Sequence, residues 1–574
     1  MPALKFGQWA PDLSSYKANT SQTITNVIAR ADGYGPFNDL LAFTQTLPGP
    51  CRGFYYGRQP DGTVQIFAGT ATDLYLLDNS SFGWNKVSIS GGYSSLSNDA
   101  NWQFAQFGSI VFATQQNVVL QSYNMSSSTL FANQAGSPPQ ASYITVVGQF
   151  LVLSGLLSNE FRLQWSGIGD PTNWVAGLNQ SDFQDFPDGG IVRGVAGGEY
   201  GTVFQDTCIR SMVYQPGSPV IFQITKVADD MGLFAPYGIV RAGDSIYIPS
   251  TKGFQVLAPG ALPAPIGKEQ VDRTFFANID QSNMQLCVGF ADPASTRVGW
   301  AFKSINGGTT GLFDTMLIYD PLIGQNGTWT QITSILGEYI SSLSKPGITL
   351  EGLDAIAPGA LAITGAANNG SGLIRIAVGA TATLANGQIV GITTVVGTTE
   401  ANGNWTITVI DGTHFDLTKN FNTGAPSAFV NAYISGGIVG GSIDAMTQSL
   451  DSFPASTLVA LSAFTQAGAL GFFNGPALQA TLDTAEQGGD FNRVSMKKGM
   501  RPDTDAPTVY GSVGCRENLQ SAVVYSAETL VNAQGVCPTR VSTRYARMRI
   551  RIPYGTDWTF ATAVEPMIGQ EGIR

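Results

Sequence analysis

The stretch FYYGRQPDGTVQIFAG (residues 54–69) carries the pattern that decides the fold: two runs rich in aromatic and β-branched residues are separated by a Pro-Asp-Gly turn. The pattern continues in DLYLLD (73–78), WQFAQFGSIVFAT (102–114) and NVVLQSY (117–123). Short apolar runs bounded by Gly, Asn, Asp, Ser and Pro are typical of strands joined by hairpin turns. Because helical periodicity is scarce, the sequence predicts an all-β chain.

A loose repeat runs through the first half of the chain, in which strands joined by tight turns end in an outer strand close to an aromatic residue. Its units begin near residues 53, 101, 141, 190, 234 and 283, with spacings of 48, 40, 49, 44 and 49 residues. Four-stranded propeller blades recur about every 40 to 50 residues, so we predict a β-propeller body. The alternative is a set of unrelated β-sandwiches, which place a turn about every 8–12 residues.

Composition narrows the possible functions. Of 574 residues only 12% are charged, while 43% are apolar and 10% are aromatic, so the chain is not a disordered protein and contains at least two domains. His414 is the only histidine, which excludes multi-His metal sites and every His-based triad whose other members lie away from His414. We therefore expect a protein that is not an enzyme and that has no cofactor and no metal.

The net charge of -11 argues against a surface that gathers nucleic acid or anionic membrane over its whole extent, although a local basic patch is compatible with it. The N-terminal residues lack the basic segment and apolar core of a secretory signal, so we expect a soluble protein made in a cytoplasm. Five widely spaced cysteines contain no C-x-x-C pair and are expected to be reduced and buried. They are Cys51, Cys208, Cys287, Cys515 and Cys537.

A separate module is predicted between residues 364 and 441. From residue 355 to residue 399 the only charged side chain is Arg375, and Asn-Gly and Asp-Gly turns separate short alternating strands. These strands predict a small β-barrel or β-sandwich, tethered by flexible flanks as an insertion.

The chain accordingly divides into six predicted parts. They are an N-terminal segment (1–52) that contributes to platform or propeller closure, propeller blades (53–345), a linker (346–363), the inserted module (364–441), resumed propeller or platform strands (442–490) and a basic C-terminal β region (491–574).

The charge balance inverts between residues 491 and 551, where ten basic residues face four acidic ones. In RYARMRIRIP the strand period of two places Arg547, Arg549 and Arg551 on one face and apolar residues on the other. Together with Arg544 these arginines are candidates for a contact with a neighbouring subunit or an adaptor, or for a surface that faces DNA, since a guanidinium group binds both carboxylate and phosphate. A solvated strand face is the structural alternative.

Other motifs favour structural roles. The carboxylates of Asp182, Asp185 and Asp188 are expected in a turn-rich loop, because a calcium loop needs more oxygen ligands and a final glutamate. The glycine-rich segments lack the lysine and the following helix of a phosphate-binding loop. Trp165 and Trp174 are expected to anchor blade packing, although an exposed aromatic platform would serve a carbohydrate.

Four stretches, spread over most of the chain, resemble the tail nozzle or tail-tube proteins of short-tailed bacteriophages. They are RADGYGPFNDL (30–40), WSGIGDPTNW (165–174), FNGPALQATLDTAE (473–486) and GVCPTRVSTRYARMRIRIPYGTDWTFATAVEP (535–566). The stretch VGTTEANGNWTITVIDGTHFDL (396–417) resembles a small β module that recurs in phage structural proteins and is related to the first catalytic-cysteine half-domain of ubiquitin-activating enzymes. No cysteine occurs in it here, so no ubiquitin chemistry follows.

The resemblance implies a virion protein that forms a hexameric ring of propeller and platform parts below the portal and its adaptor. Such a ring would retain the packaged genome, conduct duplex DNA without sequence specificity during ejection, and carry tail fibres, tailspikes or a needle. The residues that match the family motifs are expected to be structural: Arg30, Asp32, Gly33, Trp165, Asp170, Pro171 and Trp174. The alternatives are a carbohydrate-binding or depolymerising propeller and a cytoplasmic propeller scaffold.

Overall fold

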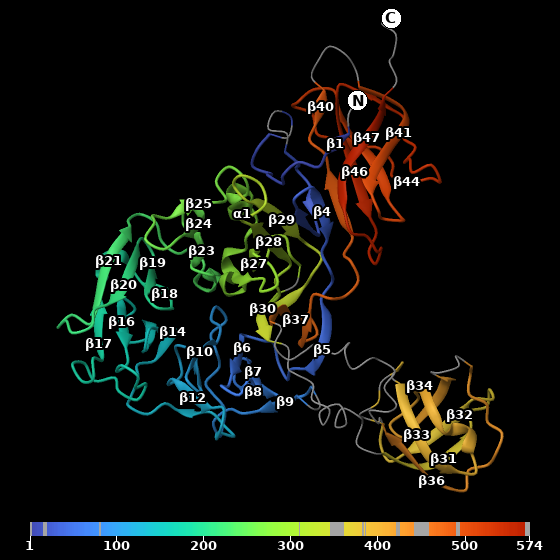
Figure 1. The fold of residues 1–574 in the computed structure, drawn as a ribbon, viewed down its shortest axis with the longest axis horizontal. Coiled ribbons are helices and arrows are strands. Elements are labelled where there is room, and N and C mark those ends of the chain that lie inside the picture. The colour runs from blue at the N-terminus through green and yellow to red at the C-terminus, as the bar shows by residue number, and fades with distance from the viewer. Residues whose placement is uncertain are drawn as a thin grey trace, which may run out of the picture. The chain divides into compact units, whose positions relative to one another are not determined.

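The computed structural model describes residues 3–14, 16, 20–79, 82–308, 310–344, 361–381, 384, 386–387, 389–420, 425–440, 459–488 and 494–568. The chain divides into two compact units, and the second consists mainly of residues 345–458. The first unit contains a β-propeller and a platform of two sheets, and the second contains a closed β-barrel (Figure 1). The predicted all-β fold with a propeller body is confirmed.

Six propeller blades are each built from four consecutive antiparallel strands. Blade 1 contains β6 (Phe54–Arg58), β7 (Val64–Gly69), β8 (Leu74–Leu77) and β9 (Trp84–Lys86); blade 2 contains β10 (Gln103–Phe107), β11 (Ile110–Thr114), β12 (Gln121–Asn124) and β13 (Ala132–Asn133); blade 3 contains β14 (Ala141–Val147), β15 (Phe150–Leu156), β16 (Arg162–Trp165) and β17 (Asp182–Asp185). Blade 4 contains β18 (Val192–Ala196), β19 (Gly201–Gln205), β20 (Ile209–Tyr214) and β21 (Phe222–Ala228); blade 5 contains β22 (Val240–Ala242), β23 (Ser245–Ser250), β24 (Gly253–Leu257) and β25 (Ala264–Pro265); blade 6 contains β26 (Val288–Ala291), β27 (Val298–Phe302), β28 (Thr315–Asp320) and β29 (Thr328–Ile332). Their first strands begin within six residues of the repeat starts predicted from the turn spacing.

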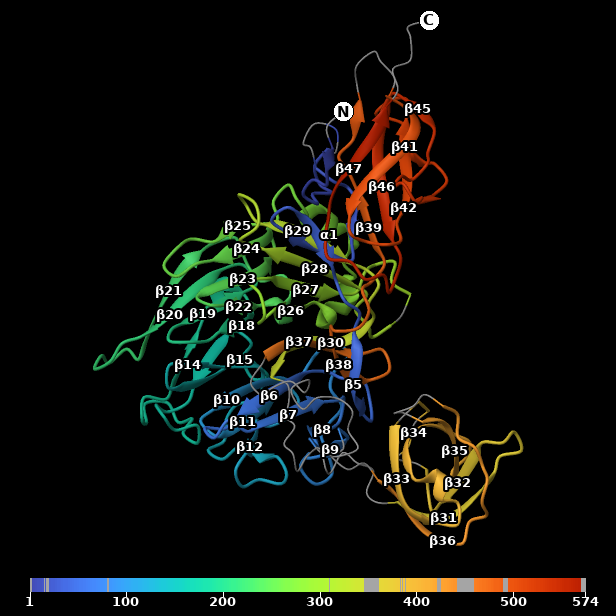
Figure 2. The ribbon, with the colours of Figure 1, turned by 45° about the vertical axis from the view of Figure 1, so that its right-hand side comes forward.

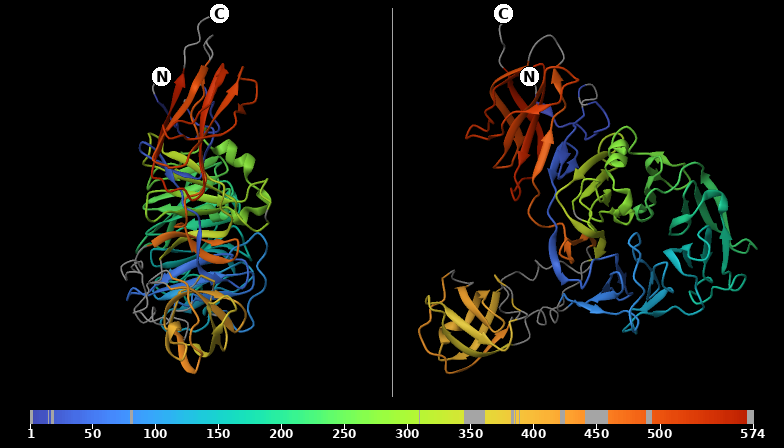
Figure 3. Two further views of the ribbon diagram at one scale, coloured as in Figure 1. Left: turned by 90° about the vertical axis from the view of Figure 1, so that its right-hand side faces the viewer. Right: turned by 180° about the vertical axis from the view of Figure 1, so that it is seen from behind.

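The seventh blade joins distant parts of the chain. It contains β30 (Gly337–Ser344), β37 (Val459–Thr465), β38 (Ala469–Phe472) and, as its edge strand, β5 (Leu41–Thr46). β30 contacts both β26 and β6, so blade 7 lies between blades 6 and 1 and closes the ring (Figures 1 and 3). A ring closed in this way excludes the alternative of independent sandwiches.

The described helices are short, and all but one of them lie between blades, the exception being a 3-10 turn in the inserted barrel. The single α-helix in the described part of the chain is α1 (Asp272–Asn278), and the 3-10 turns are η1 (Pro187–Gly189), η2 (Pro236–Gly238), η3 (Gln281–Leu286) and η4 (Thr399–Ala401). Asp12 accepts hydrogen bonds from the backbone N–H groups of Arg273 and Thr274 and so fastens the N-terminal segment to α1.

The platform consists of two sheets (Figure 2), and their buried apolar residues belong to a cluster that extends into blades 5 and 6. One sheet contains β1 (Leu4–Lys5), β3 (Val27–Arg30), β4 (Gly33–Pro36), β41 (Val494–Thr504), β45 (Val541–Thr543) and β47 (Ala561–Ile568). The other contains β2 (Ile24–Thr25), β39 (Ala480–Asp483), β40 (Gln487–Gly488), β42 (Tyr510–Arg516), β43 (Val524–Tyr525), β44 (Thr529–Leu530) and β46 (Tyr545–Ile552). Since β2 pairs with β29 on one side and with β39 on the other, this second sheet is continuous with blade 6.

The inserted module is a closed six-stranded barrel in the order β31-β32-β35-β34-β33-β36. Its strands are β31 (Leu361–Asn368), β32 (Ile374–Val378), β33 (Ile389–Val396), β34 (Gly403–Val409), β35 (His414–Asn420) and β36 (Ser435–Gly440). β31 begins three residues before the boundary predicted near residue 364, because Leu361 and Ala362 pair with β36 to close the barrel. The rest of the predicted linker, residues 346–360, lies outside the described residues.

Candidate functional site

The basic C-terminal region forms one patterned face on the platform. In β46 (Tyr545–Ile552) every second residue from Ala546 is buried, and the residues between them, including Arg547, Arg549 and Arg551, are partly exposed. The period-two prediction is therefore correct for these three residues. Arg516 of the neighbouring strand β42 lies opposite Tyr545 and therefore belongs to the same face as these three arginines. We call the side chains of Arg516, Arg547, Arg549 and Arg551 the arginine face.

Arg549 is held by a buried carboxylate. Its Nε and Nη2 atoms donate to the two oxygens of Asp483 at 2.6 and 2.9 Å, and Asp483 is 0% exposed. The hydroxyl of Tyr525 also donates to Asp483, at 2.6 Å, and the guanidinium carbon lies 3.7 Å from the centre of the Tyr525 ring. Burial, assisted by the charge of Asp483, raises the pKa of Tyr525, so the phenol remains a hydrogen-bond donor.

Two further arginines of this face are also paired inside the chain. Arg551 donates to Glu528 through Nε and Nη2, at 2.9 and 2.6 Å, and its hydrogen bonds lower the pKa of the Glu528 carboxyl. Arg516 donates to the buried carboxylate of Glu486 in the same two-pronged manner, with an Nε to Oε1 distance of 2.7 Å. Planar guanidinium groups suit this bidentate geometry.

Arg547 differs from its neighbours. Among the described residues no carboxylate lies within ion-pair distance of it, and its buried Nε atom has no hydrogen-bond acceptor. Its guanidinium carbon lies 5.6 Å from the centre of the Tyr525 ring, which is a cation–π contact. Arg544 lies just before β46, is exposed, and does not belong to this face. Within the arginine face, Arg547 is thus the arginine that has no acidic partner among the described residues.

The residues that sequence reasoning missed are the partners of the arginines: Asp483, Glu486, Tyr525 and Glu528. Asp483 is separated from Arg549 by 66 positions and Glu486 from Arg516 by 30, so no local spacing connects them. The one available signal was that Asp483 and Glu486 lie in the stretch 473–486, which carries part of the family resemblance.

The N-terminal motif residues meet the C-terminal strand in the platform. Arg30 Nη1 donates to the carbonyl of Thr559 at 2.7 Å, and Asp32 lies 4.0 Å from Arg30. A Cβ at Gly33 would stand 2.4 Å from the carbonyl oxygen of Ala561, so only glycine permits this approach of β4 to β47. These three residues line a pocket of about 190 Å³ beside Lys5 and Thr328.

The mid-propeller motif builds the long loop between β16 and β17. Trp165 and Trp174 are buried, and their indole N–H groups donate to the carbonyls of Gln180 and Pro171 at 3.0 and 2.9 Å. Asp170 accepts from the N–H and hydroxyl of Thr172 at 2.9 and 2.6 Å. Neither tryptophan offers the exposed platform that a carbohydrate site would need.

Hydrogen bonds cross one end of the propeller axis. The N–H of Asn101 donates to the hydroxyl of Tyr237 at 2.9 Å, and its side-chain amide donates to the carbonyl of Gln285 at 2.7 Å. These residues precede the first strands of blades 2, 5 and 6, so bonds between them close the axis at this level.

A buried acid lies on the first strand of blade 7. The carboxylate of Glu338 accepts a hydrogen bond from the backbone N–H of Cys51 at 2.7 Å, which links blade 7 to the segment that enters blade 1. Burial raises the pKa of Glu338 to about 7.

The three aspartates of blade 3 do not form a metal site. Asp182 and Asp185 lie in strand β17, where a loop was expected; Asp185 pairs with Arg162, and Asp188 pairs with Arg210 and Lys226. Within the described ranges no group of three His, Cys, Asp or Glu residues could hold a metal. All five cysteines are free, and Cys515 is partly buried while the other four are buried.

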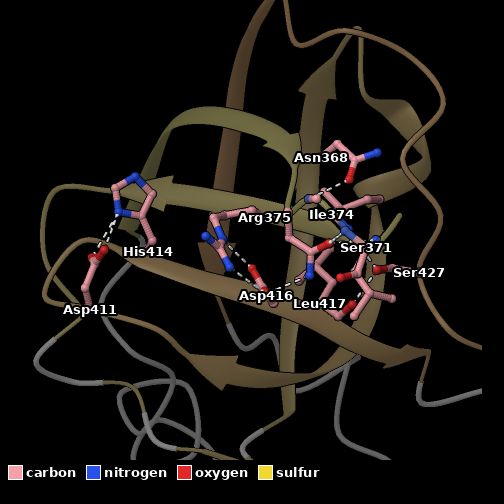
Figure 4. Close-up of polar contacts among 12 residues, drawn as sticks. Asn368, Ser371, Ile374, Arg375, Asp411, His414, Asp416, Leu417 and Ser427 are labelled. Carbon is pink, nitrogen blue, oxygen red and sulfur yellow. Dashed lines mark hydrogen bonds and ion pairs between the residues drawn. The ribbon is translucent and has the colours of Figure 1, made fainter.

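Polar contacts on the barrel are internal (Figure 4). Arg375 of β32 donates to Asp416 of β35 at 2.6 and 2.9 Å, and His414 Nδ1 lies 2.9 Å from Asp411. The hydrogen bond from the Thr413 backbone and the contact with His414 lower the pKa of Asp411 to about 2. These pairs belong to turns and to adjacent strands and do not converge on a cavity.

No protein-family model matches the chain, and no curated protein matches it. Among solved structures the chain is similar to the WD40 repeats of RRP9, with a TM-score of 0.34, 9% identity, and coverage of 71% of this chain and 98% of that chain. It is also similar to U3-55K, with a TM-score of 0.31, 10% identity, and coverage of 71% and 100%. The propeller assignment follows from strand order and ring closure. In the described part of the chain no helix has the length and apolar character needed to cross a membrane.

Proposed function

We propose that this chain is a non-enzymatic virion protein that forms the tail nozzle ring of a short-tailed bacteriophage. The ring extends the channel of the portal and its adaptor, retains the packaged genome, conducts DNA during ejection and anchors peripheral tail parts. The proposal starts from the four family-like stretches, and the geometry of the platform supports it.

The observation that carries the proposal is the convergence of three of these stretches. Residues 30–40, 473–486 and 535–566 are far apart in the chain, yet β4 pairs with β47 through Tyr34 and Ala561, and β39 pairs with β46 through Asp483 and Arg549. Three separate stretches that resemble one family thus meet in a single part of the structure. The platform is therefore the part on which the resemblance concentrates.

A ring that retains packaged DNA also needs a stiff connection between the propeller and the platform. Thr25 of β2 pairs with Gln331 of β29, and Ile24 and Thr25 pair with Leu482 and Thr481 of β39, so hydrogen-bonded strands run from blade 6 into the platform. Because protein cores are close-packed and transmit strain, such a connection suits a particle that contains DNA under pressure.

The propeller axis is an unsuitable path for DNA, since the bonds of Asn101 to Tyr237 and Gln285 close it. A DNA channel would instead lie between copies arranged in a ring. Residues 53–344 contain 12 basic and 21 acidic side chains. An acidic wall would let phosphates slide past, whereas a basic wall would bind them.

Electron cryomicroscopy of virions from the genome that encodes this chain tests the proposal. The expected result is a ring of copies below the adaptor, with a mainly uncharged or acidic lumen. Density for the chain elsewhere in the particle, or its absence from purified virions, would refute the proposal. A carbohydrate-active propeller receives no support, because both motif tryptophans are buried and the 270 Å³ cleft between blades 4 and 5 contains no tryptophan.

A further inference from the structure

The described part of the chain supplies carboxylates for three of the four arginines of the arginine face. Arg516, Arg549 and Arg551 each have an acid within the chain, whereas Arg547 has none among the described residues. A guanidinium group that has no acidic partner inside the chain can take one from outside it, through paired hydrogen bonds to a carboxylate. Arg547 packs with Val523 and Tyr525 over Gly514, beside β43, which is the last strand of its sheet. Arginine and tyrosine at a sheet edge are typical anchors of protein interfaces.

A surface of complementary character lies on blade 3. No lysine or arginine occurs from residue 163 to residue 192, and Asp170 and Asp182 have no basic partner in the described structure. Within the loop of residues 167–181, which we call the blade-3 loop, Val175 and Leu178 are 62% and 58% exposed. The same loop thus contains two exposed aliphatic side chains and an acid without a basic partner in the described structure.

Hydrogen bonds within the blade-3 loop and to both neighbouring blades hold it in place. Besides the two indole bonds, Asn173 Nδ2 donates to Leu178 O at 3.1 Å, and Gln134 of blade 2 donates to Pro171 O at 3.0 Å. Tyr214 of blade 4 donates to the side chain of Gln180 at 2.8 Å. A loop anchored from both neighbouring blades loses little entropy on binding, which favours association.

The arginine face and the blade-3 loop lie on different parts of the chain, the platform and the propeller. The platform sheet extends from blade 6, and in a ring of seven blades blade 3 is three positions away, the largest separation available. A contact between two different surfaces of identical chains is head-to-tail and closes into a ring when its rotation permits.

Leu519 lies between β42 and β43, is 41% exposed, and accepts a hydrogen bond from Arg516 through its carbonyl. We propose that Arg547 of one copy binds the carboxylate of Asp170 in the blade-3 loop of the next copy, with Val175 and Leu178 packed against Tyr525 and Leu519. This inference rests on the proposed ring, and it names the residues that join its subunits. The pair would satisfy the guanidinium of Arg547, and the aliphatic contacts would exclude water from it.

Cysteine cross-linking in assembled virions tests the contact. A chain carrying both Val175→Cys and Leu519→Cys, treated with a short thiol-specific cross-linker, should give a ladder of covalent multimers, because each copy then links to the next. Either single variant should give none, and the matched control Val213→Cys with Leu519→Cys should also give none, since Val213 is an exposed residue of blade 4. The native cysteines are buried or partly buried, which limits background.

Charge reversal supplies a second measurement. Arg547→Glu should reduce the multimer yield about tenfold or more, and adding Asp170→Lys should restore it. Arg544→Glu, at an exposed arginine outside the face, should leave the yield unchanged. Rings visible by electron microscopy without a ladder from the double-cysteine chain would overturn the contact and leave the proposed function standing. Virions without a ring of this chain would overturn the function itself.

Discussion

At the scale of single residues, the strongest constraint is the ion pair of Arg549 with Asp483, whose carboxylate is completely buried. Arg549→Met would leave that charge without a counter-ion, so we expect a loss of about 3–5 kcal/mol in the free energy of unfolding. Chemical denaturation measures it. Arg544→Met, at an exposed site, should change stability by less than about 0.5 kcal/mol. Equal effects of the two changes would contradict the assignment.

Glu338 predicts a pH dependence of stability. Its pKa is about 7 in the folded chain and ordinarily 4.5, so the folded state binds more protons than the unfolded state between these values. The free energy of unfolding should therefore fall as the pH rises from about 4.5 to 7, by up to on the order of 3 kcal/mol. Glu338→Gln keeps an acceptor for the Cys51 N–H group and should flatten this slope. Denaturation curves at pH 5 and pH 8 provide the measurement, and an unchanged slope in the variant would contradict it.

Residue-level prediction from the sequence succeeded for alternation and failed for pairing. The order Arg-x-Arg-x-Arg was enough to place Arg547, Arg549 and Arg551 on one face, because side-chain direction in a strand depends only on neighbours. The acids Asp483 and Glu528 determine which arginines are neutralised. These acids are far from the arginines in the sequence, and the folding of the chain brings them together. The distinct role of Arg547 could not be predicted for the same reason.

At the scale of elements, β5 closes the propeller by adding an N-terminal edge strand to β38. Phe43 of β5 packs on Phe472 with ring centres 5.3 Å apart. Phe43→Ala should therefore cost about 2 kcal/mol of stability, less than a fully buried phenylalanine. It should also expose the segment between β5 and β6 to proteases. Leu41→Ala, at a residue 54% exposed, is the matched control, and similar proteolysis of both variants would argue against closure through β5.

Elements built from consecutive residues were predictable, and elements built from separated segments were not. Blades 1 to 6 follow the spacing of turns in the sequence, since each contains four consecutive strands. Blade 7 combines strands at 41–46, 337–344 and 459–472, so no local repeat reveals it. The start of the barrel at Leu361 was not predicted for the same reason, because Leu361 becomes a strand residue through pairing with Val439 at the far end of the module.

At the scale of the whole molecule, the barrel is inserted between β30 and β37, two paired strands that a simple hairpin turn could connect. Ser344 and Val459 are partners across β30 and β37, so both ends of the insertion emerge from adjacent strands. Among the described residues, the apolar core of the barrel is built from residues between 361 and 439. An insertion that enters and leaves at one point, and that has its own core, is expected to fold without disturbing its host.

Replacing residues 345–458 by Asn-Gly should therefore convert β30 and β37 into a plain hairpin, because Asn-Gly favours the tight turn that joins paired strands. Scanning calorimetry of the full chain should show two unfolding transitions. The shortened chain should keep the propeller transition within a few degrees and lose the other, while residues 361–440 alone should reproduce the lost one. A shortened chain that fails to unfold cooperatively would mean that the barrel is required for blade 7 and would contradict this division of the molecule.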